Sequence, residues 1–123
     1  WAKVASPYQA NRVKENMMDK SKFNVLMPLQ TLSADHPKFK PNRGYWRGPN
    51  WLDQSYFGVK GLYNYNFKTE AHKLATKLIY NAEGLLDKGP SIRENYHPTT
   101  GQGLEAKNFS WSAAHYLLLL MEK

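Results

Sequence analysis

The sequence predicts an all-α fold, because apolar residues recur at helical spacing in several segments and alternating apolar and polar residues never run long enough for a substantial sheet. Two of the helical segments carry aromatic or aliphatic residues nearly all round, and an amphipathic segment lies between them. A helix that is apolar on every side must be buried. The pattern therefore predicts inner helices that are covered by outer ones.

The first expected helix covers Pro7 to Lys20, where Val13, Met17 and Met18 keep a loose helical spacing with charged residues between them. From Asn24 to Arg43 the chain contains three prolines among serine, aspartate and asparagine, which is the composition of turns and loops. A loop of this length in a compact domain is usually functional.

Three further helices are expected. The first covers Pro49 to Tyr63, with proline in the first turn and no polar side. The second runs from Lys68 to Asp87 with one apolar and one charged face. The last begins at Ser110, a favourable N-cap residue, and continues to Met121 without an obvious polar face.

This layering is the arrangement of an α/α barrel. Six helical hairpins need roughly 200 residues at mean helix and loop lengths, whereas this chain has 123 residues and about four expected helices. We therefore expect residues 1–123 to be one portion of a larger domain. Because apolar inner helices cannot remain at the surface, we expect the remainder of that domain or self-association to cover them.

Composition excludes several classes of function. The net charge is +7, but the 17 lysines and arginines are scattered, and their densest cluster (Lys38, Lys40 and Arg43) lies in the proline-rich loop, so we expect no nucleic-acid partner. No apolar run approaches the roughly 20 residues that span a bilayer, so we expect no membrane partner. The four histidines show no metal-binding spacing and there is no cysteine, so we expect no metal or cofactor.

The segment from Tyr45 to Leu62 reads YWRGPNWLDQSYFGVKGL, and eight of the 17 aromatic residues fall between Tyr45 and Phe67. Sugar rings stack their C–H faces on aromatic rings, and their hydroxyls bind arginine, aspartate and amide side chains. Both kinds occur here, and the candidate sugar-binding residues are Trp46, Arg47, Trp51, Asp53 and Gln54. The alternative is that the aromatic residues belong to the core, which is the commoner location of large apolar side chains.

A second expected loop, Lys88 to Asn108, contains Glu94 between Arg93 and Asn95. A carboxylate over the mouth of a barrel can act as a general base that activates water, provided that a second carboxyl group lies about 6.5–9.5 Å away. The alternative is a surface glutamate paired with Arg93.

The segment from Ser91 to Tyr116 reads SIRENYHPTTGQGLEAKNFSWSAAHY. Together with YWRGPNWLDQ it resembles the C-terminal signature of glycoside hydrolase family 63, most closely the bacterial α-glucosidase branch. The resemblance implies the C-terminal part of an (α/α)6 catalytic barrel in an inverting, exo-acting α-glucosidase that hydrolyses disaccharides or oligosaccharides. It also favours a periplasmic or extracytoplasmic location.

The resemblance assigns the role of general base to Glu94 and places the YWRG and WLDQ residues at the glucose-binding end of the pocket. Asn95, Tyr96 and Trp111 lie where supporting contacts to Glu94 or to the sugar are expected. The family's general acid is an aspartate from an earlier part of the barrel, and nothing before Arg43 resembles its motif. Asp53 is an alternative acid within this chain, and a non-catalytic carbohydrate-binding or interaction module is the alternative function.

Overall fold

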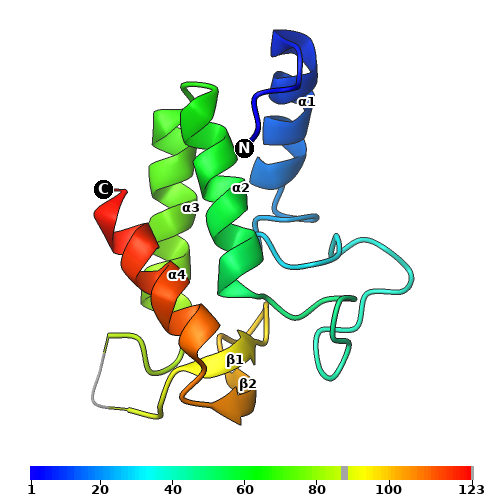
Figure 1. The fold of residues 1–123 in the computed structure, drawn as a ribbon. Coiled ribbons are helices and arrows are strands. Elements are labelled where there is room, and N and C mark those ends of the chain that lie inside the picture. The colour runs from blue at the N-terminus through cyan, green and yellow to red at the C-terminus, as the bar shows by residue number, and fades with distance from the viewer. Residues whose placement is uncertain (87–88, 123) are drawn as a thin grey trace.

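The computed structural model describes residues 1–86 and 89–122, which form four helices and a small β-hairpin (Figure 1). The elements follow one another along the chain as α1 (Pro7–Met18), α2 (Leu52–Asn64), α3 (Lys68–Asn81), β1 (Arg93–Tyr96), β2 (Gly103–Lys107) and α4 (Ser110–Met121). Between α1 and α2 a long segment without helix or strand extends to one side of the helices and returns to the start of α2, as the three prolines predict.

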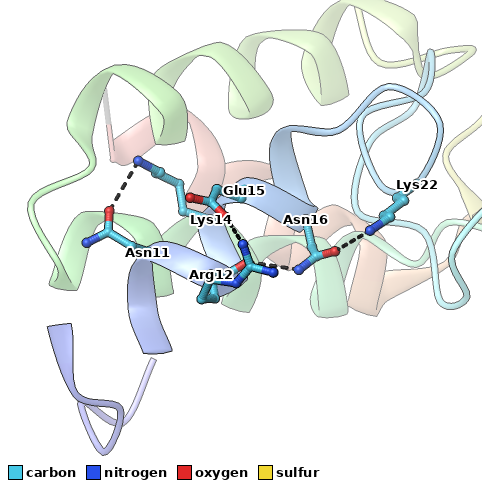
Figure 2. A network of polar contacts seen from close by, with 6 residues as sticks. All are labelled: Asn11, Arg12, Lys14, Glu15, Asn16 and Lys22. Atoms are coloured by element: carbon cyan, nitrogen blue, oxygen red, sulfur yellow. Dashed lines mark hydrogen bonds and ion pairs between the residues drawn. The ribbon is translucent and has the colours of Figure 1, made fainter. Parts of the chain in front are cut away.

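Helix α1 begins where the sequence predicts, because Ser6 and Gln9 form a capping box and Pro7 occupies the first turn. Figure 2 shows the polar contacts along this helix. Arg12 pairs with Glu15 at 2.7 Å, and Lys22 beyond the helix donates to the Asn16 side chain at 2.7 Å. The helix therefore carries its polar residues toward water.

The core lies between α2, α3 and α4, with α2 and α3 packed as an antiparallel pair and α4 against both. On α3 the buried positions recur at spacings of three and four, which confirms the predicted apolar face. Those residues are Ala71, Leu74, Ala75, Leu78 and Ile79.

Several helix boundaries differ from the prediction: α1 ends at Met18 and not at Lys20, and α2 ends one residue later than expected, at Asn64. Helix α2 begins at Leu52 with Trp51 as its N-cap, because Asn50 is held in an extended β-bridge to Tyr96. Helix α3 ends at Asn81, because the next residues leave the helix and the Glu83 N–H donates to the Gly101 carbonyl at 3.0 Å. Asp87 and Lys88, where the helix and the following loop were expected to meet, lie outside the described residues.

Helix α4 also departs from the prediction. Its N-cap is Phe109, and Ser110 is the first helical residue, so the expected capping by Ser110 is wrong. The helix buries only Ser112 and Leu119, and it exposes apolar side chains: Trp111, Leu117, Leu118 and Met121. Within this chain α4 is therefore packed on one side only, and α2 likewise exposes Phe57.

The β-hairpin shows that the fold is not purely all-α. Strands β1 and β2 pair antiparallel in the segment that was expected to be a loop, so Glu94 lies on a strand. The Gly101 backbone adopts φ +77°, and a Cβ there would stand 2.0 Å from the Asn81 carbonyl oxygen. Glycine thus allows the turn of the hairpin to pack against the end of α3.

None of the described helices combines the length and the apolar character needed to cross a membrane.

Replacing Leu78 by alanine should lower the free energy of unfolding of the intact protein by about 2–5 kcal/mol, because the side chain is fully buried and its removal leaves a cavity. Leu86, which is 55% exposed, provides the matched control, and Leu86→Ala should change stability by less than about 0.5 kcal/mol. Urea unfolding measures both. Equal effects would contradict the assignment of the core.

Candidate active site

The two motifs identified in the sequence meet at one pair of residues. The Asn50 N–H donates to the Tyr96 carbonyl at 2.8 Å, and the Tyr96 N–H donates to the Asn50 carbonyl at 2.9 Å. The Asn50 side chain also donates to the Pro28 carbonyl at 2.5 Å. These bonds place the YWRGPNW segment beside β1, at the end of the helical bundle where α2 and α4 begin (Figure 1).

Glu94 lies in the middle of this region. Its side chain is half-buried, and its carboxylate accepts a long hydrogen bond of 3.4 Å from the Ala106 N–H on β2. Arg93 turns its guanidinium away and donates instead to the Glu105 carbonyl at 2.6 Å. Among the described residues Glu94 forms no ion pair, so the alternative of a surface pair with Arg93 is wrong.

A hollow of about 420 Å³ opens beside Glu94. Its lining residues are Arg43, Tyr45, Pro49, Glu94, Asn95 and Glu105. Three of them have a left-handed backbone, with φ of 53° at Arg43, 56° at Tyr45 and 57° at Glu105. Residues with a Cβ rarely adopt this conformation, and such strain collects at functional sites.

Asn95 is the most unusual residue of this hollow. The residue is 1% exposed, and neither its amide nitrogen nor its amide oxygen makes a hydrogen bond within the described chain. A buried amide without partners is unfavourable by about 1–3 kcal/mol. The Asn95 amide is therefore a donor and an acceptor without partners in the described chain, buried in the wall of the hollow.

The aromatic residues of the first motif form one cluster in which burial differs sharply. Trp51 is 2% exposed and its indole N–H donates to the Tyr45 carbonyl at 3.3 Å. Trp46 stacks on Trp51 with ring centres 4.5 Å apart and an interplanar angle of 18°, yet remains 46% exposed. Trp51 is thus a core residue that supports Trp46, and Trp46 presents a face to solvent.

Asp53 and Gln54 lie in the first turn of α2, where the Gln54 amide donates to the Asp53 carboxylate at 3.2 Å. Gln54 and Trp46 line a different hollow of about 540 Å³ between α1 and α2, and neither Asp53 nor Gln54 lines the hollow beside Glu94. Of the expected sugar-binding residues, only Asn95 lines the hollow beside Glu94, and Trp46 and Gln54 line the other hollow. The remaining ones line neither hollow: Arg47, Trp51, Asp53, Tyr96 and Trp111.

The remaining expected site residues have distinct positions. Tyr96 is fully buried, and its hydroxyl accepts a hydrogen bond of 3.1 Å from the Arg93 N–H; burial raises the pKa of this hydroxyl. Trp111 is 57% exposed at the start of α4 and contacts Phe109 edge to face at 5.5 Å. Arg47 is exposed, and its backbone closes a tight turn with Lys40 and Gly44.

Four residues of the hollow beside Glu94 were not expected as site residues from the sequence, and Pro49, inside the first motif, is one of them. Tyr45 begins the first motif and Arg43 precedes it by two positions, so their closeness to the motif in the sequence could have identified them as candidate lining residues. Glu105 has no sequence signal, because only the pairing of β2 with β1 brings it to the hollow. Within the described ranges no group of three or more histidine, aspartate or glutamate side chains could hold a metal ion.

The sequence profile of the mannosylglycerate hydrolase MGH1-like glycoside hydrolase domain matches residues 1–112. The chain belongs to this family. Mannosylglycerate hydrolase of Thermus thermophilus is 38% identical over 70% of the chain, and alpha-glucosidase 2 of Arabidopsis thaliana is 32% identical over 80%. The crystal structure of the family 63 mannosylglycerate hydrolase of Thermus thermophilus with Tris and D-glycerate superimposes on 97% of the chain with a TM-score of 0.75 and 29% identity.

These matches confirm the resemblance to the C-terminal catalytic part of family 63 glycoside hydrolases. The chain spans only a minor part of each relative: 19% of the Thermus hydrolase, 14% of the Arabidopsis protein and 27% of the crystallised chain.

Replacing Asn95 by leucine should raise the free energy of unfolding of the unliganded intact protein by about 1–3 kcal/mol, because the buried amide has no hydrogen bond to lose and leucine removes its desolvation cost. Asn50→Leu is the matched control, since Asn50 is equally buried but bonds to Pro28 and Ser55, and it should lose about 1–3 kcal/mol. Thermal unfolding compares the two. A comparable loss at Asn95 would mean that another part of the protein already binds its amide.

Proposed function

We propose that this chain supplies the general base of an inverting glycoside hydrolase, with Glu94 in that role. The carboxylate takes a proton from a water molecule while the oxygen of that water attacks the anomeric carbon. The bond to the leaving oxygen breaks in the same step, and that oxygen receives a proton from a separate acid. The observation that carries the proposal is the hollow that Glu94 shares with the unpartnered amide of Asn95.

The surroundings of Glu94 support this role. The Ala106 N–H orients the carboxylate, and no cation in the described chain neutralises it through an ion pair. Asn95 offers both a donor and an acceptor, which matches a sugar hydroxyl that accepts and donates. Trp46 lines the other hollow, but its ring contacts that of Tyr45 in the hollow of Glu94, and its exposed face suits a sugar ring.

For the substrate we propose a mannosylglycerate-type glycoside. The Thermus relative named for this activity is 38% identical, compared with 32% for the Arabidopsis alpha-glucosidase. Arg43 is the one cation among the described residues that line the hollow, and a guanidinium binds a carboxylate such as that of glycerate in a bidentate manner. An α-glucoside cleaved by an exo-acting enzyme is the second candidate, supported by the relatives named as glucosidases.

The general acid is proposed to come from outside this chain. Asp53, the alternative acid, bonds to Gln54 and does not line the hollow that contains Glu94. We propose that residues 1–123 form part of an (α/α)6 barrel, in which further helices cover the exposed apolar side of α4. Self-association is the other arrangement that would cover it.

Glu94→Gln in the intact protein should lower kcat for mannosylglycerate by at least about 1,000-fold, because the amide cannot accept a proton, while binding of the sugar persists. Glu15→Gln on α1 is the control and should keep full activity, since Glu15 is exposed and bonds only to Arg12. Release of mannose is measured enzymatically, with p-nitrophenyl α-glucoside as the second substrate.

Proton NMR of the first product released shows whether the anomeric configuration is inverted. Hydrolysis of only the α-glucoside would select the second candidate substrate. Wild-type rates in Glu94→Gln would exclude the proposed base, and sugar binding without hydrolysis of either substrate by the wild type would favour the non-catalytic module.

Trp46→Ala should raise KM about 3- to 10-fold, the size expected when one ring-stacking contact is lost, with kcat nearly unchanged. Tyr8→Ala is the control, because Tyr8 is 75% exposed on α1. An unchanged KM for Trp46→Ala would show that this ring does not bind the sugar.

A further inference from the structure

The two strands of the hairpin pair with an irregularity at Glu94. Arg93 is opposite Lys107, and Asn95 is opposite Leu104, so Glu94 alone faces both Glu105 and Ala106. This is a β-bulge, in which two residues of one strand oppose one residue of the other. Bulges are common beside active sites, where they redirect a side chain or a backbone group.

The peptide group between Glu105 and Ala106 is turned by this bulge. Glu105 has φ of 57°, which is unfavourable for a residue with a Cβ, so the surroundings must hold it there. The carbonyl of this peptide accepts from the Arg93 guanidinium at 2.6 Å, and its N–H donates to the Glu94 carboxylate at 3.4 Å. In a planar trans peptide these two groups point in opposite directions, so fixing one aims the other.

The Arg93 side chain is itself held in place. A Cβ at Gly103 would lie 2.2 Å from the Cγ of Arg93, so the absence of a side chain at Gly103 lets the arginine stem cross β2. The guanidinium is charged, and a charged donor on the carbonyl polarises the peptide and strengthens the hydrogen bond that its N–H donates. Three groups are thus linked in a row: the Arg93 guanidinium, the Glu105–Ala106 peptide and the Glu94 carboxylate.

We propose that Arg93 is a positioning residue for Glu94 that acts through the Glu105–Ala106 peptide, with Gly103 providing the space for it. The proposal rests on the proposed role of Glu94 as general base. Arg93 does not contact the substrate in this arrangement, and its effect is on the orientation of the carboxylate. A carboxylate that is misplaced by about 1 Å can lose about 100-fold in rate.

The first experiment measures kcat and KM of Arg93→Ala in the intact protein. We expect kcat to fall about 10- to 100-fold with KM within about threefold, because orientation of the base affects the chemical step. Added ethylguanidinium should restore part of kcat by binding the freed carbonyl, and Arg93→Lys should be intermediate, because lysine lacks the planar guanidinium. Arg12→Ala on α1 is the matched control and should keep both constants (Figure 2).

The second experiment uses Gly103→Ala, whose Cβ displaces the arginine stem. It should lower kcat to a similar extent in the presence of Arg93 and have little further effect in the Arg93→Ala background. If Gly103 were needed only for the fold of the strand, Gly103→Ala would lower kcat equally with and without Arg93.

The third experiment does not depend on activity. Hydrogen exchange at the Ala106 amide should accelerate in Arg93→Ala, whereas the Tyr96 amide, which donates to Asn50, should keep its rate.

The outcomes separate the two proposals. If Glu94→Gln is inactive but folded Arg93→Ala keeps kcat within twofold, the positioning role is overturned and the function of Glu94 stands. If Glu94→Gln keeps wild-type activity, the proposed function fails, and exchange at Ala106 still shows whether Arg93 holds the peptide. An unchanged exchange rate at Ala106 would overturn the positioning role by itself.

Discussion

The reciprocal backbone hydrogen bonds between Asn50 and Tyr96 are the constraint on which the arrangement of the site depends. They join the segment before α2 to the first strand of the hairpin, and the Asn50 side chain ties both to the Pro28 carbonyl. Along the chain the aromatic motif and Glu94 are separated by α2, α3 and a loop, and the junction joins them directly in space. The junction is fully buried, so its hydrogen bonds are shielded from water and cannot be replaced by it.

The residues around this junction differ in burial and in hydrogen bonding. Trp51 and Tyr96 are buried; Trp51 supports the exposed ring of Trp46, and Tyr96 follows Glu94 by two residues on β1. The Asn95 amide has no partner among the described residues, and three other residues of the same hollow have a left-handed backbone. Such unfavourable features are tolerated where the surrounding packing over-determines them, and here the hairpin, the α3 terminus and the start of α4 provide that packing.

The sequence could predict the helices and the motif residues, because helical periodicity is local and the motif letters are read directly. It could not predict the hairpin. Strands of four and five residues carry too little pattern, and the burial of β1 does not alternate. Ser110 was a favourable N-cap by residue type, yet the chain enters α4 one residue earlier, since helix ends depend on the preceding backbone.

The sequence by itself determined the apolar face of α3, the start of α1 at Pro7, the proline-rich segment and the set of residues that identify the family. These features depend on residues that are close together in the chain. Only the tertiary structure decided which of the tryptophans is buried, that Asp53 lies apart from the hollow of Glu94, and that Glu105 lines it. Those outcomes depend on packing and hydrogen bonds between residues that are distant in the chain, such as Arg93 with Glu105 and Asn50 with Tyr96, and no local pattern encodes them.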